Sequence, residues 1–374
     1  MTGVALRTLA LITASVALTA AESTRFIDLS RDQARQVVVD REAGQYLGHP
    51  TTLLLEDGRT LLCVYPKGHG EGAILYKRST DGGRTWSARL PVPASWETSR
   101  ETPTLHRVID AAGHRRIILF SGLYPIRMSV SEDDGLTWSE LKPIGTFGGI
   151  VAMASVVELK TGPGHYMALF HDDGRFIANG GSKTGRFTVY KTLSRDGGLT
   201  WSQPAVVASS SEVALCEPGA FRSPDGRTIA VLLRENRRVR RSHIIVSGDE
   251  GQTWSEPREV SLALTGDRHV AKYAPDGRLV VSFRDLPPKG TASETAGDWM
   301  VWVGRWEDVV GGGDGQYRVR LADNADPWDA AYPGVERLGD GTFVATTYGH
   351  WVEGQEPFVL SVRFRLEELD RLGR

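Results

Sequence analysis

Short runs in which apolar and polar residues alternate recur along the whole chain and are separated by glycine-rich turns. Typical examples are AILYKR at residues 73–78 and HIIV at residues 243–246. Because alternation with a period of two places the apolar side chains on one face of a strand, these runs predict short β-strands rather than long helices. Glycine accounts for 42 of 374 residues, which adds many tight turns to this pattern.

One eight-residue motif, Ser-x-Asp-x-Gly-x-x-Trp, occurs four times. Its Ser and Asp side chains can bond nearby backbone amides, and its Gly accepts the positive φ that a tight turn requires. Each copy lies between two strand-like runs, so the motif predicts a strand-to-strand turn with the Trp ring folded over the strands beneath. The intervals between copies, 52, 63 and 53 residues, suit a propeller blade or a solenoid unit. The copies begin at Ser79, Ser131, Ser194 and Ser247.

A second repeated feature gives the number of units. Six short turn sequences each lie between two β-like runs, as hairpin turns do. Six units of four short strands predict an all-β fold, namely a six-bladed β-propeller of four-stranded antiparallel blades. We expect residues 35–40 to complete the blade that contains residues 357–366, which would close the ring. The turns are Asp57-Gly58, Ala112-Gly113, Pro163-Gly164, Asp225-Gly226, Asp276-Gly277 and Asp340-Gly341.

The first residues have the composition of a secretory signal peptide. Arg7 supplies a positive charge, and residues 9–20 (LALITASVALTA) form an apolar run that ends in small residues. Twelve residues are too few to cross a bilayer, which takes about 20. We therefore predict a signal peptide over residues 1–21, a secreted or periplasmic protein without a membrane span, and a single propeller domain over residues 22–374.

Charge and cysteine content narrow the possible partners. The 44 basic residues against 46 acidic ones give a net charge of −2, so no overall field attracts nucleic acid or anionic lipid. Cys63 lies in an apolar run and is far from Cys216 in the sequence, which favours two unpaired buried thiols. Neither cysteine has the spacing of a metal site, so we expect no metal and no cofactor.

The repeated motif resembles the Asp-box (BNR repeat) of the sialidase (neuraminidase) superfamily, whose fold is a six-bladed β-propeller. The resemblance covers essentially the whole chain after the signal peptide. It implies a secreted exo-glycosidase that hydrolyses a terminal, acidic sugar, sialic acid or a similar one, from glycans. The boxes themselves lie on turns at the rim, so function is expected where the innermost strands converge on the axis.

Counting from each hairpin turn locates the residues that should face the axis. Polar residues recur at two equivalent points of successive units, just before the innermost strand and at the end of the second strand. Ionisable residues gathered in this way predict a polar site on the axis. The candidates are His49, Glu101, Glu217, Arg268 and Tyr332 at the first point and His69, Glu71, His171, Asp172, Arg234 and Arg284 at the second.

The resemblance implies a nucleophile and its base. Sialidases use Tyr as nucleophile, because an anionic sugar repels a carboxylate, and a Glu partner deprotonates the phenol. The family's Tyr opens the inner strand of the last blade, and Tyr332 in Ala-Tyr-Pro-Gly-Val matches that position. The family's Glu opens the inner strand of the fourth blade, where this chain has Glu217.

The family also binds its substrate carboxylate with three arginines, since guanidinium groups make bidentate charged hydrogen bonds. Arg234 follows Glu217 at the family's separation and matches one of them. The first family arginine, in an Arg-Ile-Pro motif, is missing here, because the chain has His49 before Pro50. Arg284 and Arg268 are the candidates for the third.

The family's acid/base is an Asp in the loop of the first blade, where this chain has residues 66–71 (PKGHGE). Glu71, or in second place His69, is therefore the predicted proton donor, provided that burial or a neighbour raises the pKa of the carboxyl group.

Three alternatives remain open. A related glycosidase for another sugar would use two carboxylates, Glu101 or Asp172 together with Glu217. A non-catalytic propeller would bind a glycan through the same ring of residues. A polysaccharide lyase would use His49 or His269 for proton transfer.

Overall fold

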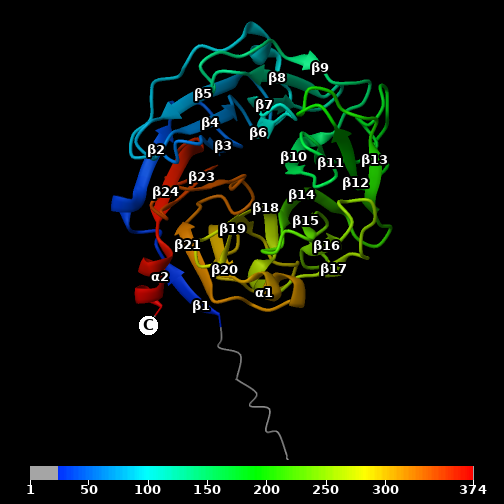
Figure 1. The fold of residues 1–374 in the computed structure, drawn as a ribbon. Helices are drawn as coiled ribbons and strands as arrows, with labels where there is room; N and C mark the ends of the chain where they lie inside the picture. The colour runs from blue at the N-terminus through cyan, green and yellow to red at the C-terminus, as the bar shows by residue number, and fades with distance from the viewer. Residues whose placement is uncertain (1–23, 374) are drawn as a thin grey trace, which may run out of the picture.

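The computed structural model describes residues 24–373, and six small β-sheets in it fan around a common centre (Figure 1). Within each sheet the strands follow one another mostly in chain order and pair antiparallel, apart from one parallel edge strand. The predicted all-β, six-bladed β-propeller is confirmed. The expected signal peptide, residues 1–21, lies outside the described residues.

We number the blades along the chain and name their strands from the axis outward. Blade 1 contains β3 (Thr51–Leu54), β4 (Leu61–Pro66) and β5 (Ile74–Ser79). Blade 2 contains β6 (Thr104–Ile109), β7 (Arg115–Ser121), β8 (Arg127–Ser131) and β9 (Lys142–Pro143). Blade 3 contains β10 (Ile150–Glu158), β11 (Tyr166–Asp172), β12 (Thr188–Ser194) and β13 (Ala205–Ser209).

The second half of the chain forms the other three blades. Blade 4 contains β14 (Leu215–Arg222), β15 (Ile229–Glu235), β16 (His243–Ser247) and β17 (Arg258–Glu259). Blade 5 contains β18 (Gly266–Tyr273), β19 (Leu279–Asp285), β20 (Trp299–Gly304), β21 (Tyr317–Ala322) and β1 (Arg25–Asp28). Blade 6 contains β22 (Gly334–Arg337), β23 (Phe343–Gly349), β24 (Phe358–Phe364) and β2 (Gln36–Asp40). The helices are η1 (Gln33–Arg35), η2 (Ala94–Thr98), η3 (Leu262–Leu264), α1 (Trp306–Gly311) and α2 (Leu366–Leu372).

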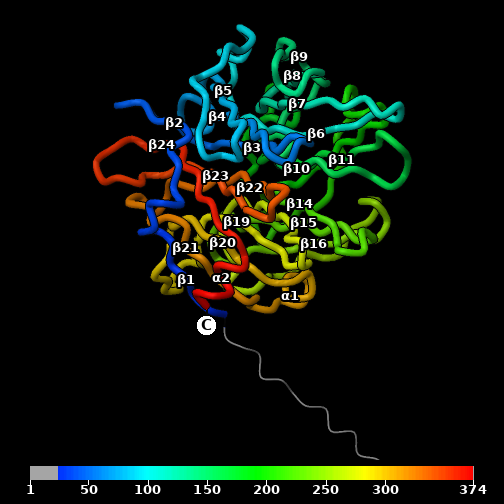
Figure 2. The backbone as a smooth tube through the Cα atoms, turned by 60° about the vertical axis from the view of Figure 1, so that its left-hand side comes forward, coloured from blue at the N-terminus to red at the C-terminus, as the bar shows by residue number. Residues whose placement is uncertain are grey.

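The ring closes as predicted, with a strand from near the start of the described chain in the last blade. Strand β2 pairs antiparallel with β24, with Gln36 opposite Val362, and the two strands lie side by side in both Figure 1 and Figure 2. The innermost strands also contact one another in ring order, from β3 through β22 and back to β3. Closure by the two ends of the chain holds blades 1 and 6 together.

Two blades depart from the expected four strands. Blade 1 has three, because the segment after its Asp-box contains Pro91 and Pro93, which have no backbone N–H to donate to a ladder. Leu90 still donates one bond to the carbonyl of Tyr76 at 2.9 Å. Blade 5 has five strands, because β1 adds to the outer edge of β21 in parallel.

Apolar clusters fill the spaces between successive blades. Strand β7 shows how the alternation of the sequence achieves this: Ile117 and Leu119 pack toward blade 1, whereas Ile118 and Phe120 pack toward blade 3. A blade is therefore buried on both faces, which is why its central strands are apolar at nearly every position. Cys63 and Cys216 are buried and unpaired in this packing, as predicted.

The four Asp-boxes form the strand-to-strand turns that the sequence predicts. In each box the Ser hydroxyl donates to the Asp carboxylate and accepts the N–H of the Gly four residues further on. For Ser194 these distances are 2.8 Å to Asp196 Oδ1 and 2.9 Å from Gly198 N. The other boxes repeat the pattern at Ser79, Ser131 and Ser247. Among residues 24–373 no helix has the length and apolar character to cross a membrane.

Candidate active site

Irregular backbone near the start of the innermost strands turns side chains toward the axis. Between Cys216 and Gly219 the register of β14 shifts, so that two residues face one on β15. A bulge of this kind re-aims a side chain, and here it re-aims Glu217, whose φ is 52°. His49 and Arg268 have the same left-handed backbone, with φ of 53° and 51°. This conformation is costly for a residue with a Cβ atom, and it is concentrated at sites of function.

Glu217 is at the centre of the polar site. Its Oε1 atom accepts a hydrogen bond from the hydroxyl of Tyr332 and a second from Arg234 Nη1 at 2.6 Å. Burial alone would raise the pKa of Glu217, but the charge of Arg234, the Tyr332 hydrogen bond and His171 together outweigh it and leave that pKa below its ordinary value. Burial and the Glu217 charge raise the pKa of Tyr332 far above 10. The resting pair is therefore a carboxylate and a neutral phenol.

A fully buried aspartate, Asp267, holds three arginines behind Glu217. Arg238 donates to its Oδ2 atom at 2.7 Å, Arg284 donates to the same atom at 2.5 Å, and Arg234 lies 3.3 Å from Oδ1. These charges keep the pKa of Asp267 well below its usual range, although its 0% exposure would raise it. Asp267 was not among the residues predicted from the sequence.

Two polar atoms of the site, one on Arg268 and one on Glu217, are buried with neither a hydrogen bond nor an ion pair among the described residues. Arg268 donates from Nη2 to the carbonyl of Ala154 at 3.1 Å, but its Nη1 atom is unpartnered. Glu217 Oε2 is likewise unpartnered. Buried polar atoms are satisfied in most proteins, so this donor and this acceptor are available to a ligand.

Glu101 is a second buried carboxyl group near the axis. Its oxygens accept the backbone N–H of Thr102 at 2.9 Å and of Val151 at 3.0 Å. Burial raises the pKa of Glu101 to about 7, and the charge of Glu217 adds to the increase. The two glutamates thus have different protonation states near neutral pH.

His171 and Asp172 lie at the end of β11, as expected, and have different surroundings. His171 Nδ1 accepts the backbone N–H of Glu217 at 3.3 Å, and burial lowers its pKa to about 4, so the ring supports Glu217 as a neutral group. Asp172 accepts backbone N–H groups from Gly174 at 2.6 Å and Phe176 at 3.1 Å. Its contacts are those of a turn-stabilising carboxylate.

A second cluster surrounds Asp329, which sequence reasoning missed. Tyr46 donates to Asp329 Oδ1 at 2.7 Å and Tyr348 donates to it at 2.9 Å. His350 Nε2 lies 3.1 Å from Oδ2, and His69 Nδ1 lies 3.2 Å from Oδ1. These bonds outweigh burial and hold the pKa of Asp329 well below its usual range.

His49 connects the two clusters. Its ring centroid lies 4.3 Å from that of Tyr332 and 4.8 Å from that of His69. Nδ1 of His49 accepts the N–H of Gly70 at 3.0 Å, and Nε2 lies 3.2 Å from the Tyr348 hydroxyl. Burial, with the nearby charge of His69, lowers the pKa of His49 well below 6.5.

Comparison with known proteins supports the family suggested by the repeats. A model described as "BNR repeat-like domain" matches residues 125–289, and one described as "BNR/Asp-box repeat" matches residues 77–88. A sialidase from Micromonospora viridifaciens is 26% identical over 252 residues, which cover 58% of this chain and 35% of that protein. The match therefore spans about a third of the relative's length. The two BNR matches and the sialidase relative together support a BNR propeller of the sialidase superfamily.

Solved structures with the same fold include glycosidases of two kinds. A protein of unknown function from Dyadobacter fermentans has a TM-score of 0.68 at 15% identity, covering 88% of this chain and 97% of its own. The α-L-arabinofuranosidase Arb93A from Fusarium graminearum has a TM-score of 0.64 at 15% identity over 90% and 99%. The NanB sialidase from Streptococcus pneumoniae has a TM-score of 0.60 at 12% identity, and the match covers 89% of this chain and 71% of its own. At these identities the likenesses support the six-bladed propeller fold.

In this BNR propeller the candidates from the sequence do not all lie in one place. Glu217, Tyr332 and Arg234 contact one another directly. Glu71 is exposed, and its carboxylate makes no hydrogen bond or ion pair with any residue in the range 24–373. Asp329 stands three residues before Tyr332, and this proximity to the candidate nucleophile is the one signal that could have identified it.

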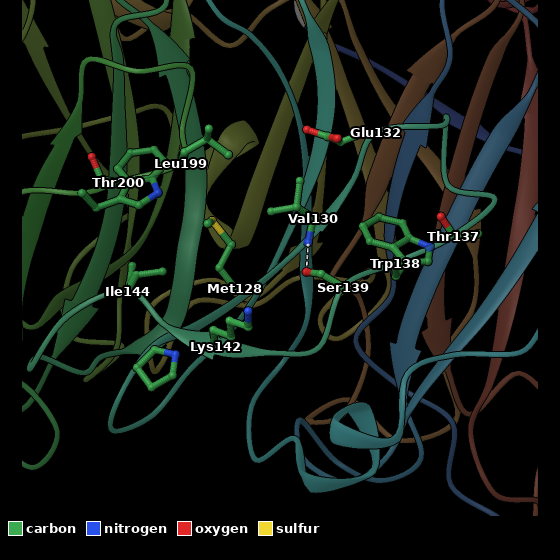
Figure 3. A pocket seen from close by; sticks show the side chains of 12 residues that line it. Met128, Val130, Glu132, Thr137, Trp138, Ser139, Lys142, Ile144, Leu199 and Thr200 are labelled. Atoms are coloured by element: carbon green, nitrogen blue, oxygen red, sulfur yellow. Dashed lines mark hydrogen bonds between the residues drawn. The ribbon is translucent and has the colours of Figure 1, made fainter.

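The BNR propeller also has a hollow at its rim, between the Asp-boxes of blades 2 and 3 (Figure 3). It has a volume of about 700 Å³ and is lined by Trp138, Trp201, Met128, Leu199 and neighbours. Its charged residues are Glu132 and Lys142, and no member of the axial clusters lines it. The two clusters of bonded ionisable residues described above therefore lie outside this hollow.

Proposed function

We propose that this propeller is an exo-acting glycoside hydrolase in which Tyr332 is the nucleophile and Glu217 its base. The observation that carries the proposal is the part-buried hydrogen bond from the Tyr332 hydroxyl to Glu217 Oε1. A phenol next to a carboxylate is a nucleophile with its base already in hydrogen-bond contact. The sialidase relative supports this assignment at the level of the family.

The pKa values indicate how the pair works. Because burial and Glu217 hold the pKa of Tyr332 far above neutrality, the phenol is not ionised in advance. The proton moves to Glu217 as the phenol oxygen attacks the anomeric carbon. Arg234 keeps Glu217 in its basic, ionised form. Attack by Tyr332 forms a glycosyl–enzyme bond that water then hydrolyses, with net retention of configuration.

The charge of the site favours an acidic sugar. Four arginines, Arg234, Arg238, Arg268 and Arg284, surround only two ionised carboxylates, Glu217 and Asp267, while Glu101 has a pKa of about 7. A buried excess of positive charge is stabilised by an anionic ligand. Arg234 and Arg284, assisted by the unpartnered Nη1 of Arg268, would hold the substrate carboxylate.

One observation favours a second candidate, a hydrolase for a neutral sugar. Glu101 and Glu217 form a pair of carboxyl groups with separated pKa values, which is the arrangement that glycosidases use for an acid and its partner carboxylate. Asp267 also pairs with three arginines, which leaves fewer of their N–H groups for a substrate carboxylate. The arabinofuranosidase neighbour is consistent with this candidate.

Two substrates and two variants separate the candidates. We expect release of 4-methylumbelliferone from its α-sialoside, abolished in Tyr332→Phe and retained in Glu101→Gln. Hydrolysis of 4-nitrophenyl α-L-arabinofuranoside that is lost in Glu101→Gln would instead support the neutral-sugar candidate. Full hydrolysis by Tyr332→Phe overturns the nucleophile. An unsaturated product absorbing in the near ultraviolet indicates a lyase, and glycan binding without turnover indicates a non-catalytic module.

We also propose that the protein acts outside the cytoplasm, on glycans, because residues 1–21 have the composition of a signal peptide. Sequencing the N-terminus of the protein recovered from culture medium or periplasm tests this. Cleavage near residue 21 supports export, and an intact Met1 contradicts it.

A further inference from the structure

The loop between β4 and β5 carries two candidates for the proton donor, and their surroundings differ. Glu71 is exposed and makes no bond within the described chain, so nothing orients its carboxylate. His69 is 65% exposed, yet its Nδ1 atom is held 2.6 Å from the Tyr46 hydroxyl and 3.2 Å from Asp329. An acid/base group needs both access to the substrate and a fixed direction, and His69 has both.

We propose that His69, oriented by Asp329 and Tyr46, is the general acid that protonates the leaving-group oxygen, an assignment that rests on the proposed hydrolase function. Asp329 and Tyr46 are positioning residues. Because Asp329 is three residues from Tyr332 in the sequence, the acid and the nucleophile share one segment of blade 6 as their support.

The hydrogen-bond pattern determines which nitrogen of His69 is reactive. Tyr46 has a single hydroxyl proton, and that proton is donated to Asp329 at 2.7 Å. The Tyr46 oxygen must therefore accept at the 2.6 Å contact, which makes Nδ1 of His69 the donor. Nε2 makes no bond to any described residue, so it is the nitrogen that exchanges a proton with substrate.

The position of His69 relative to the nucleophile suits this role. The His49 ring contacts both groups, at centroid distances of 4.8 Å from His69 and 4.3 Å from Tyr332, so the His69 and Tyr332 rings are no more than about 9 Å apart. His49 itself is unsuited as an acid, because burial keeps it neutral and both its nitrogens contact protein groups. It packs against both reacting groups instead.

The protons balance over the two steps of the reaction. In the first step the bond from the anomeric carbon to the leaving oxygen breaks, His69 Nε2 gives its proton to that oxygen, and Tyr332 Oη bonds to the carbon while its proton passes to Glu217. In the second step water attacks the carbon and gives a proton to His69. Tyr332 Oη leaves and recovers its proton from Glu217.

Titratable and charged groups from several elements surround His69. From its own loop these are Lys67 and Glu71, and from the segment before β3 they are Tyr46 and His49. Blade 6 contributes Asp329, Tyr348 and His350. Blade 5 contributes Arg284, whose charge acts to lower the pKa of Tyr46 and of His49. Tyr46 and the ionised Asp329 are the groups in direct contact with His69 Nδ1.

The test compares good and poor leaving groups, because a lost general acid matters most when the leaving group is basic. We expect His69→Asn to lower kcat/KM about 10²–10⁴-fold on sialyllactose but less than about 10-fold on 4-methylumbelliferyl sialoside. The alkaline decline in the wild-type pH–rate profile should disappear in this variant. If the sugar is neutral, arabinobiose and 4-nitrophenyl arabinofuranoside form the equivalent pair.

His114→Asn is the matched control. His114 is 71% exposed and its Nδ1 lies 3.0 Å from Asp110, so it is the same kind of His–Asp pair, but on a hairpin turn of blade 2. We expect His114→Asn to leave kcat/KM unchanged on both substrates. Asp329→Asn tests the positioning role, and Tyr46→Phe tests it independently if Asp329→Asn fails to fold. Tyr46→Phe should move the alkaline limb of the pH–rate profile without the fall in kcat/KM seen in His69→Asn.

The outcomes distinguish this inference from the proposed function. If Glu71→Gln shows the leaving-group dependence and His69→Asn does not, the general acid is Glu71, and the inference is wrong while hydrolysis stands. If the wild-type protein hydrolyses neither pair of substrates, or Tyr332→Phe is fully active, the proposed function fails and the inference with it.

Discussion

Carboxylates at the rim and at the axis of this propeller do the same thing, accepting several hydrogen bonds, but from partners at very different sequence distances. In the Asp-box at the end of β12, Asp196 accepts bonds from Ser194 and Thr200, both within four residues. At the axis, Glu217 accepts from Tyr332, 115 residues away. The rim is therefore built by local sequence, and the axial site exists only once the ring has closed.

The two regions also differ in the kind of partner. Rim carboxylates accept from backbone amides and hydroxyls next to water, whereas Asp267 has three guanidinium groups around it and 0% exposure. Removing a neutral partner at the surface costs little more than one hydrogen bond. Removing one charge from a buried cluster leaves the other charges uncompensated. The axis should be the more sensitive region in every measurement.

The largest effect is expected for Glu217→Gln. The amide keeps the shape of the carboxylate but cannot accept the Tyr332 proton, so kcat/KM should fall about 10²–10⁴-fold on a substrate that the wild-type protein hydrolyses. Steady-state kinetics measure this. Glu336→Gln is the control, since Glu336 is a buried glutamate paired with Lys272 at 3.2 Å on β22 and makes no contact with Glu217. Equal activity losses in both variants would contradict a special role for Glu217.

The next largest effect is on stability, for Asp267→Asn. Three arginines lose their shared counter-charge in a buried site, so the free energy of unfolding should fall by about 3–5 kcal/mol. Urea unfolding followed by tryptophan fluorescence measures this. Asp225→Asn serves as comparison, because Asp225 is an exposed hairpin carboxylate 3.9 Å from Arg227. The urea midpoint of this variant should equal that of the wild-type protein. A wild-type midpoint for Asp267→Asn would show that the cluster is not held by that charge.

This contrast explains how much of the molecule the sequence could predict. The four boxes, the six hairpins and the closing strand β2 are local or repeated patterns, and all of them are present as predicted. The missing strand of blade 1 was not expected, although Pro91 and Pro93 are visible in the sequence, because the repeat suggested equal blades. Repetition is informative about the number of units and uninformative about their exceptions.

The axial site was predictable only in part. Resemblance to a family suggested that Glu217 and Tyr332 belong together, and the structure places them in contact. Asp267 and Asp329 could not be found in the same way, since Asp267 is a single aspartate within β18 and Asp329 is a single aspartate in a polar loop. Their partners, such as Arg238 and Tyr46, come from other blades or distant segments, and no local pattern records that pairing.

A smaller effect is expected from the protonation of Glu101. Burial raises the pKa of this carboxyl group from 4.5 to about 7 in the folded protein, so the stability it contributes is complete below pH 4.5 and is lost as the pH rises through 7. Relative to Glu101→Gln, which cannot ionise, the wild-type protein should lose on the order of 3 kcal/mol between pH 4 and pH 8. Urea midpoints of both proteins at the two pH values test this, and a constant difference would contradict the raised pKa.

A rim substitution should cost less and leave the chemistry unchanged. Ser194 is buried and accepts the N–H of Gly198 at 2.9 Å, so Ser194→Ala leaves that amide unsatisfied and should lower the free energy of unfolding by about 1–3 kcal/mol. Turnover should be unchanged at a temperature where the variant is folded. A fall in kcat matching that of Glu217→Gln would mean that the rim and the axis are coupled, which their separate bonding does not predict.

The smallest effect is expected at the variable positions of the same turns. Leu136 follows the Gly of the second box with its side chain 71% exposed, and the equivalent residue of the fourth box is Gln252. Because the turn uses only the backbone of this position, Leu136→Gln should change the free energy of unfolding by less than about 0.5 kcal/mol. Thermal unfolding of this variant beside Ser194→Ala measures both. A large loss for Leu136→Gln would mean that the rim depends on apolar contacts in addition to the Ser, Asp and Gly bonds of the box.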